Sequence, residues 1–176
     1  RVIVITTSLG AQTMVEEDGV RVYRLLPRNI YPYTEAHKHS FVIRLFWHLF
    51  GMLPGKVVRE VLDIISKEKP DIVHTHNLMG LSFAIPSAIR GMYPWVHTVH
   101  DVQLYEPSGI ILKTKEHSYR YTGLPSRLYA ALLRSRMGSS DVVISPSQFL
   151  LDFYRAKGFF PESSLLLLRN PLTVHP

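Results

Sequence analysis

Imidazole, amide, carboxylate and hydroxyl groups follow three apolar segments of the sequence that are predicted to be strands. The residues are His76, Asn77, His100, Asp101 and Ser147. In an open α/β sheet the binding site lies beyond the carboxyl ends of the strands. Groups of these types hydrogen-bond hydroxylated ligands, and the N-terminus of a helix beside them can bind a phosphate. We therefore expect these residues to share one edge of a sheet and to contact a substrate.

Each of these residues also has a purely structural explanation. Asn77 and Asp101 are typical turn or helix-cap residues, and Ser147 is predicted to be the N-cap of the helix that follows it. His76 could simply hold the next loop. Two further histidines, His74 and His97, lie inside the predicted strands and are expected to be core residues with satisfied ring nitrogens.

The histidine spacing also raises the alternative of a metal site. Residues i and i+2 of a strand point the same way, so a His-x-His pair can bind one ion. No His-Glu-x-x-His motif is present, and we expect no metal. A metal-dependent hydrolase nevertheless stays open as an alternative, and it would use His74, His76, His97 and His100.

Several classes of chemistry are excluded by what the sequence lacks. There is no cysteine, which excludes thiolate catalysis, disulfides and cysteine zinc sites. No Gly-x-Gly-x-x-Gly, no P-loop and no Gly-x-Ser-x-Gly motif occurs among the 176 residues, so a phosphate-binding glycine loop is not expected within them. We therefore expect this chain by itself to bind no cofactor.

Strands and helices alternate along the sequence. Strands are predicted at 2–6, 20–26, 71–76, 95–99, 141–145 and 164–168, and helices at 41–53, 56–69, 78–90, 125–137 and 147–157. Alternation implies parallel pairing through right-handed crossovers, and apolar strands are typical of sheets covered on both faces. The predicted fold class is α/β, a doubly wound parallel sheet. One domain is expected over residues 1–170, and 171–176 are expected to begin a connection.

The segment 41–56 is rich in aromatic residues. It contains Arg44, Phe46, Trp47 and Lys56, and this pattern is typical of a helix that lies in the headgroup layer of a membrane. A core helix under a sheet would look similar. The formal charge of +6 favours an anionic surface, and nucleic acid is the weaker reading because no aromatic-studded platform or helix-turn-helix is present. We expect no signal peptide and no transmembrane helix, hence a cytoplasmic protein with peripheral contact to the inner membrane face.

Four motifs follow one another in a familiar order. They are Lys69–Asn77, Pro94–Asp101, Ser140–Phe149 and Leu168–Pro171. Together they resemble the amino-terminal half of family-4 retaining glycosyltransferases, enzymes with two facing Rossmann-like domains. The resemblance implies that the first strand of that fold and its glycine-rich loop would precede Arg1. It also implies that the sheet is incomplete at its amino terminus and that the second domain is absent.

The resemblance implies a division of labour. The amino-terminal domain would hold a sugar or lipid-linked acceptor, and a carboxy-terminal domain would bind the nucleoside-diphosphate sugar that donates a hexose with retention. His100 and Asp101 would be the catalytic residues, with His100 near the transferred sugar and Asp101 beside it, and Ser147 would lie in the Pro-Ser turn of that family. The chain alone would be inactive, and the whole enzyme would serve polysaccharide or glycolipid assembly. A non-catalytic binding module of the same fold is the alternative.

Overall fold

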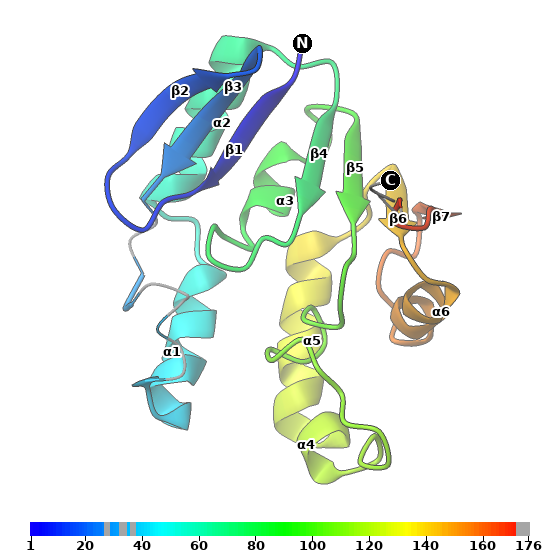
Figure 1. The fold of residues 1–176 in the computed structure, drawn as a ribbon. Helices are drawn as coiled ribbons and strands as arrows, with labels where there is room; N and C mark the ends of the chain where they lie inside the picture. Colours follow the sequence, from blue (N-terminus) through cyan, green and yellow to red (C-terminus); the bar gives the residue numbers. More distant parts are fainter. Residues whose placement is uncertain (27–28, 32–34, 36–37, 172–176) are drawn as a thin grey trace, which may run out of the picture. The chain divides into compact units, whose positions relative to one another are not determined.

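The computed structural model describes residues 1–26, 29–31, 35 and 38–171. Their contacts divide the chain into two compact units (Figure 1). Unit 1 comprises residues 1–69 and 78–88, and unit 2 comprises 70–77 and 89–176. The expected single domain over residues 1–170 stays a prediction. Of the expected connection at 171–176, only Pro171 lies within the described residues.

Unit 1 contains a three-stranded sheet in the order β1-β3-β2. Its strands are β1 (Ile3–Thr7), β2 (Thr13–Glu17) and β3 (Val20–Leu25). β1 and β3 are parallel as predicted, but β2 pairs antiparallel with β3. No strand was predicted between 2–6 and 20–26, so β2 is a correction to the sequence prediction. Asp18 and Gly19 both have positive φ, 50° and 76°, as the tight turn of a hairpin requires.

Two helices complete unit 1. They are α1 (Phe41–Gly51) and α2 (Lys56–Glu68), close to the predicted helices at 41–53 and 56–69. α2 is amphipathic and buries Val58, Val61 and Ile65. It ends because Lys69 adopts a left-handed conformation (φ 47°) and proline follows, a common way to stop a helix.

The helix predicted at 78–90 is much shorter in the structure. Only α3 (Ile85–Ile89) is helical, and turns precede it. Gly80 has φ 93°, which interrupts a right-handed helix, and Pro86 lies in the first turn of α3, where its missing N–H costs no hydrogen bond. The intervening segment is held differently, because Ser82 Oγ and the backbone N–H of Phe83 both donate to Gly51 O, at 3.0 and 2.9 Å.

Unit 2 contains a four-stranded sheet in the order β4-β5-β6-β7, with every neighbouring pair parallel. The strands are β4 (Val73–His76), β5 (Trp95–Thr98), β6 (Val142–Ser145) and β7 (Ser164–Leu167). The helices are α4 (Tyr119–Thr122), α5 (Leu124–Met137) and α6 (Gln148–Ala156). This parallel sheet with its helices confirms the predicted α/β class and is Rossmann-like.

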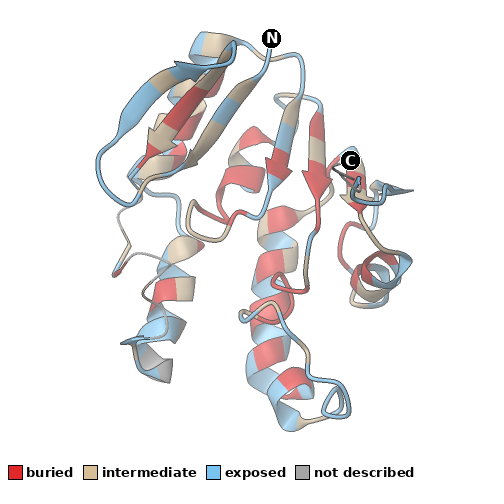
Figure 2. Cartoon of the chain, in the orientation of Figure 1, coloured by how far each residue is buried: buried red, intermediate tan, exposed pale blue. Residues whose placement is uncertain are grey.

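The core of unit 2 lies where α5 and the central strands bury their apolar side chains (Figure 2). Trp95, Leu133, Met137 and Val143 are each at most 2% exposed. At the start of the central strands, the Trp95 backbone N–H donates to the Asp141 carboxylate at 2.7 Å. This bond fixes the start of β5 against that of β6, and therefore the level at which both strands end.

Candidate functional site

The polar residues singled out by the sequence follow three adjacent strands. His76 ends β4, His100 and Asp101 follow β5, and Ser147 follows β6. Because β4, β5 and β6 are neighbours and parallel, their carboxyl ends meet at one edge of the sheet. The expectation that these residues share an edge is therefore confirmed. Their contact with a substrate stays a prediction.

Two imidazoles meet at this edge. His76 Nδ1 lies 3.0 Å from His100 Nε2 within a hydrogen bond, and both side chains are exposed. His74 lies beside His76, with ring centroids 4.1 Å apart, and its Nε2 lies 2.8 Å from Thr98 Oγ1. The expectation of His74 as a core residue is wrong, because the side of β4 that it shares with His76 is open to solvent.

The electrostatics of this cluster favour neutral rings on β4. Partial burial, and secondarily the neighbouring imidazoles, lower the pKa of His74 and of His76 below the ordinary histidine value. A ring that stays neutral near pH 7 keeps one acceptor nitrogen as well as one donor. The edge can therefore both donate hydrogen bonds to the hydroxyl groups of a ligand and accept them.

His97 lies on the opposite side of the sheet. It is 3% exposed, its Nδ1 lies 2.8 Å from Thr75 Oγ1, and Thr75 also accepts the indole N–H of Trp95 at 2.8 Å. Burial lowers the pKa of His97 to about 3. The prediction of a core histidine is confirmed.

The placement of His97 also bears on the metal hydrolase. Successive residues of a strand face opposite sides, so His97 cannot join His74, His76 and His100 around one ion. Within the described part of the chain, no group of three or more suitable side chains could hold a metal. The geometry therefore gives no support to a metal-dependent hydrolase.

Asp101 builds the turn after His100. Its carboxylate accepts the backbone N–H of Gln103 at 2.8 Å and the side-chain N–H of the same residue at 3.0 Å. Its backbone carbonyl accepts the Tyr154 hydroxyl at 2.6 Å. Neither Gln103 nor Tyr154 belongs to a recognisable motif, and nothing in the sequence links Tyr154 to a loop more than fifty residues earlier. A catalytic role for Asp101 stays a prediction.

Ser147 and Asn77 do not join the imidazole pair through a hydrogen bond. Ser147 is the N-cap of α6, since its Oγ accepts the backbone N–H of Leu150 at 3.3 Å, as the sequence indicated. Asn77 is exposed. Substrate contacts of both residues stay predictions.

The aromatic helix α1 divides its side chains between two sides. Trp47 is 4% exposed and donates its indole N–H to Tyr31 O at 2.7 Å, so it is packed inside unit 1 and not on the exposed side. Phe46 and Phe50 are 52% and 54% exposed, and Arg44 and Lys56 are exposed as well. No described helix combines the length and the apolar character needed to cross a membrane.

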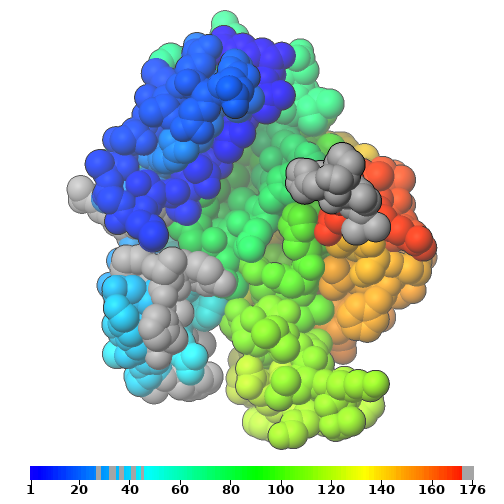
Figure 3. Space-filling view, in the orientation of Figure 1, coloured from blue at the N-terminus to red at the C-terminus, as the bar shows by residue number. Residues whose placement is uncertain are grey.

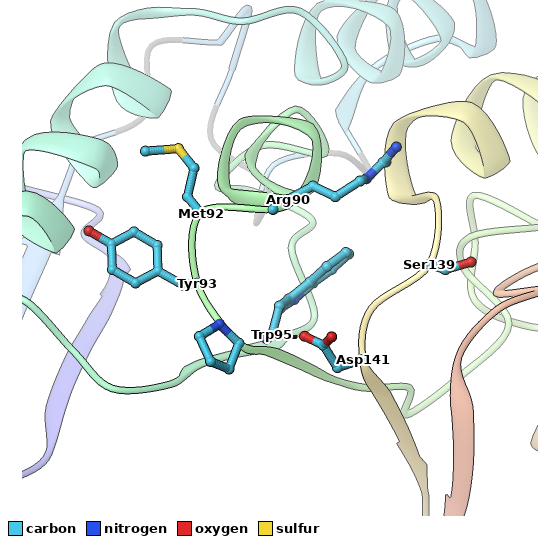
Figure 4. Close-up of a pocket in the computed structure, with 8 residues that line it drawn as sticks. Arg90, Met92, Tyr93, Trp95, Ser139 and Asp141 are labelled. Atoms are coloured by element: carbon cyan, nitrogen blue, oxygen red, sulfur yellow. Dashed lines mark hydrogen bonds between the residues drawn. The ribbon is translucent and has the colours of Figure 1, made fainter.

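A pocket of about 350 Å³ lies at the other end of the unit 2 strands (Figure 4). Its charged groups have structural partners: Arg90 Nη2 donates to Arg136 O at 3.1 Å at the end of α5, and Asp141 accepts the Trp95 N–H. The pocket is also at the amino ends of β5 and β6, away from the edge that carries sites in such sheets. It is therefore not the candidate site.

Comparison with known proteins agrees with this arrangement. The sequence profile of Glycosyltransferase Family 4 matches residues 1–172. The chain is also 29% identical, over 157 residues, to an uncharacterized 42.6 kDa protein in the cps region of Klebsiella pneumoniae; the match covers 88% of this chain and 42% of that relative. The chain thus spans less than half the length of the relative it matches. With the parallel sheet and its polar carboxyl edge, the profile match shows that the chain belongs to glycosyltransferase family 4.

Proposed function

We propose that this chain is the acceptor-binding half of a retaining glycosyltransferase, which moves a sugar from a nucleoside-diphosphate sugar to an acceptor hydroxyl. Family membership supports sugar transfer. The relative in a cps region supports a place in capsule, other polysaccharide or glycolipid synthesis. The observation that carries the proposed site is the exposed pair His76 and His100 at the carboxyl edge of the sheet.

In this proposal His100 hydrogen-bonds the transferred sugar or the acceptor. Asp101 acts beside it by shaping the loop, since its carboxylate already accepts two hydrogen bonds from Gln103. A carboxy-terminal partner domain supplies the donor contacts, and closure of the two domains aligns the substrates and excludes water. The chain without that domain therefore binds an acceptor and does not turn over.

The test uses a protein in which this chain is joined to its carboxy-terminal partner domain. His100→Ala should lower the rate of sugar transfer by about 100-fold, because it removes a hydrogen bond at the reacting centre. His117→Ala, a change at an exposed histidine of the loop before α4, is the matched control. Unchanged turnover in His100→Ala would reject the site. Binding of the donor sugar without turnover in the wild type would instead favour a non-catalytic module.

We further propose that α1 brings the enzyme to an anionic membrane surface, where a lipid-linked acceptor would be found. Its exposed apolar side chains are Ile43, Phe46, Leu49, Phe50 and, just after the helix, Leu53. The helix contains no acidic residue. Some of its side chains lie at the surface in the view of Figure 3, where they are cyan. An apolar stripe beside exposed basic residues fits a headgroup layer with anionic lipids.

A further inference from the structure

Two histidines of β4 lie side by side, and the second of them contacts His100. His74 and His76 are two residues apart in a strand and therefore face the same side. Their ring centroids are 4.1 Å apart with an interplanar angle of 37°. His74 is tied to the next strand, because its Nε2 lies 2.8 Å from Thr98 Oγ1. His76 is therefore packed against a ring that is itself held in place.

His76 in turn contacts His100 through one specific pair of atoms. The two nitrogens, Nδ1 of His76 and Nε2 of His100, are 3.0 Å apart, and the rings are nearly parallel, at 24°. A hydrogen bond between two imidazole nitrogens needs one that donates and one that accepts. The bond therefore commits Nε2 of His100 and leaves its Nδ1 for another partner.

The surroundings of His76 suit this role. Partial burial, and secondarily the imidazoles of His74 and His100, lower the pKa of His76 and so disfavour its charged form. A neutral His76 avoids charge repulsion with a neighbouring imidazole that is positively charged. It therefore keeps its hydrogen bond to His100 over the pH range in which the enzyme would work.

We propose that His76 is a positioning residue that fixes the ring orientation and tautomer of His100, so that Nδ1 of His100 is the nitrogen presented to the sugar or acceptor. This rests on the proposed function, because His100 must contact substrate for its orientation to matter. An imidazole alone on a loop can rotate about its side-chain bonds. The hydrogen bond to a strand residue removes that freedom before substrate binds.

Kinetics of paired amide variants test this role, in the protein that contains both domains. An asparagine amide reaches the position of Nδ1, whereas a glutamine amide reaches that of Nε2. His76→Asn should therefore keep the hydrogen bond and retain kcat within about threefold, and His76→Gln should lose about tenfold in kcat with little change in the acceptor KM. Equal kcat values for the two variants would overturn the proposal.

Asparagine and glutamine variants of His100 distinguish its two nitrogens in the same way, but here Nε2 contacts His76 and Nδ1 faces the substrate. His100→Asn keeps an amide at the nitrogen that faces the substrate, and His100→Gln keeps only the bond to His76. We expect His100→Asn to be the more active of the two by about tenfold. Greater activity of His100→Gln would show that the substrate meets Nε2, and the proposal would be wrong.

A spectroscopic readout separates this inference from the proposed function. In the same protein with ¹⁵N-labelled histidine, long-range ¹H–¹⁵N spectra report which nitrogen of His100 carries the proton. The wild type should show one fixed tautomer, unchanged in His76→Asn and averaged in His76→Gln. An averaged wild-type spectrum would refute the positioning role, even if the enzyme is active. A fixed tautomer in a protein without transferase activity would refute the proposed function alone.

Discussion

The phenol of Tyr154, on α6, donates a hydrogen bond to the backbone carbonyl of Asp101 at 2.6 Å. The same hydroxyl accepts the backbone N–H of Leu104 at 3.3 Å. Tyr154 is 2% exposed, and burial raises its pKa well above the usual tyrosine value, so it remains a donor at any pH where the protein would be studied. One side chain thus fixes both ends of the turn that follows His100.

Removal of this hydroxyl should destabilise the protein. Tyr154→Phe leaves a half-buried carbonyl and a buried N–H without their partner, which costs about 1–3 kcal/mol of unfolding free energy. Tyr119→Phe is the matched control, because Tyr119 is 73% exposed and its change should cost less than about 0.5 kcal/mol. Urea unfolding measures both variants. Equal unfolding free energies in the two would contradict the structural role of Tyr154.

His97 should make the stability of the protein fall in mild acid. Its pKa is about 3 in the folded protein and about 6.5 in an unfolded chain. As the pH falls below about 6.5, His97 becomes protonated in the unfolded chain but stays neutral in the folded protein. Each pH unit down to about 3 then removes up to about 1.4 kcal/mol of stability.

A variant that cannot titrate isolates this contribution. Asparagine places an amide where Nδ1 of His97 meets Thr75, so His97→Asn keeps a polar contact and should show a shallower loss of stability between pH 7 and 5. His117→Asn, at an exposed position, should leave the slope as in the wild type. The measurement is urea unfolding at a series of pH values. A wild-type slope in His97→Asn would show that another group is responsible.

Glu68 should contribute stability at neutral pH. Its carboxylate, 6% exposed, accepts hydrogen bonds from the Tyr23 hydroxyl and the Arg21 guanidinium. These bonds, that of Tyr23 first, lower the pKa of Glu68. A carboxyl with a lowered pKa stabilises the fold above about pH 4.3 and loses that effect as the pH falls through its folded value.

Glu68→Gln should therefore lower Tm at pH 7 and differ less from the wild type in acid. The matched control is Glu17→Gln. This change breaks an ion pair between Glu17 and Arg24, 3.1 Å apart, in which Glu17 is 57% exposed. Exposed pairs contribute little, so this change should shift Tm less. The prediction fails if Glu17→Gln has the larger effect, or if the Glu68→Gln difference grows as the pH is lowered.

The double variant Phe46→Ser, Phe50→Ser should bind anionic vesicles at least about tenfold more weakly than the wild type, because two exposed apolar side chains no longer enter the headgroup layer. Sedimentation with phosphatidylglycerol-containing vesicles measures this. Leu132→Ser with Phe149→Ser, at residues 48% and 68% exposed on α5 and α6, is the control pair. If the Phe46, Phe50 variant unfolds, this side of α1 belongs to the core. If the variant binds vesicles as tightly as the wild type, α1 does not contact the membrane.

Much of unit 2 could be predicted because its signals are local. Apolar β-branched runs alternate with amphipathic helices, and such alternation forces parallel pairing. Once the strands are parallel neighbours, the residues after them must share an edge, so His76, His100 and Asp101 could be brought together from the sequence. β2 could not be predicted in the same way, because three of its five residues are polar, although the Asp18-Gly19 turn after it is evident in the sequence.

The order of strands, helices and polar residues along the chain is enough to predict the α/β class, the family and the edge of the sheet where chemistry is expected. Which histidine faces which way depends on packing between segments that are distant in the sequence. Period-two alternation states that His74 and His76 share a side, but not which side is covered. That depends on residues far along the chain, such as Phe160, whose ring packs 5.7 Å from that of His97, and on the register that sets Thr98 beside His76. For the same reason Trp47 is buried and Phe46 is exposed, although the two are adjacent and both aromatic. The burial of each side chain depends on which distant segments pack against that side of the helix.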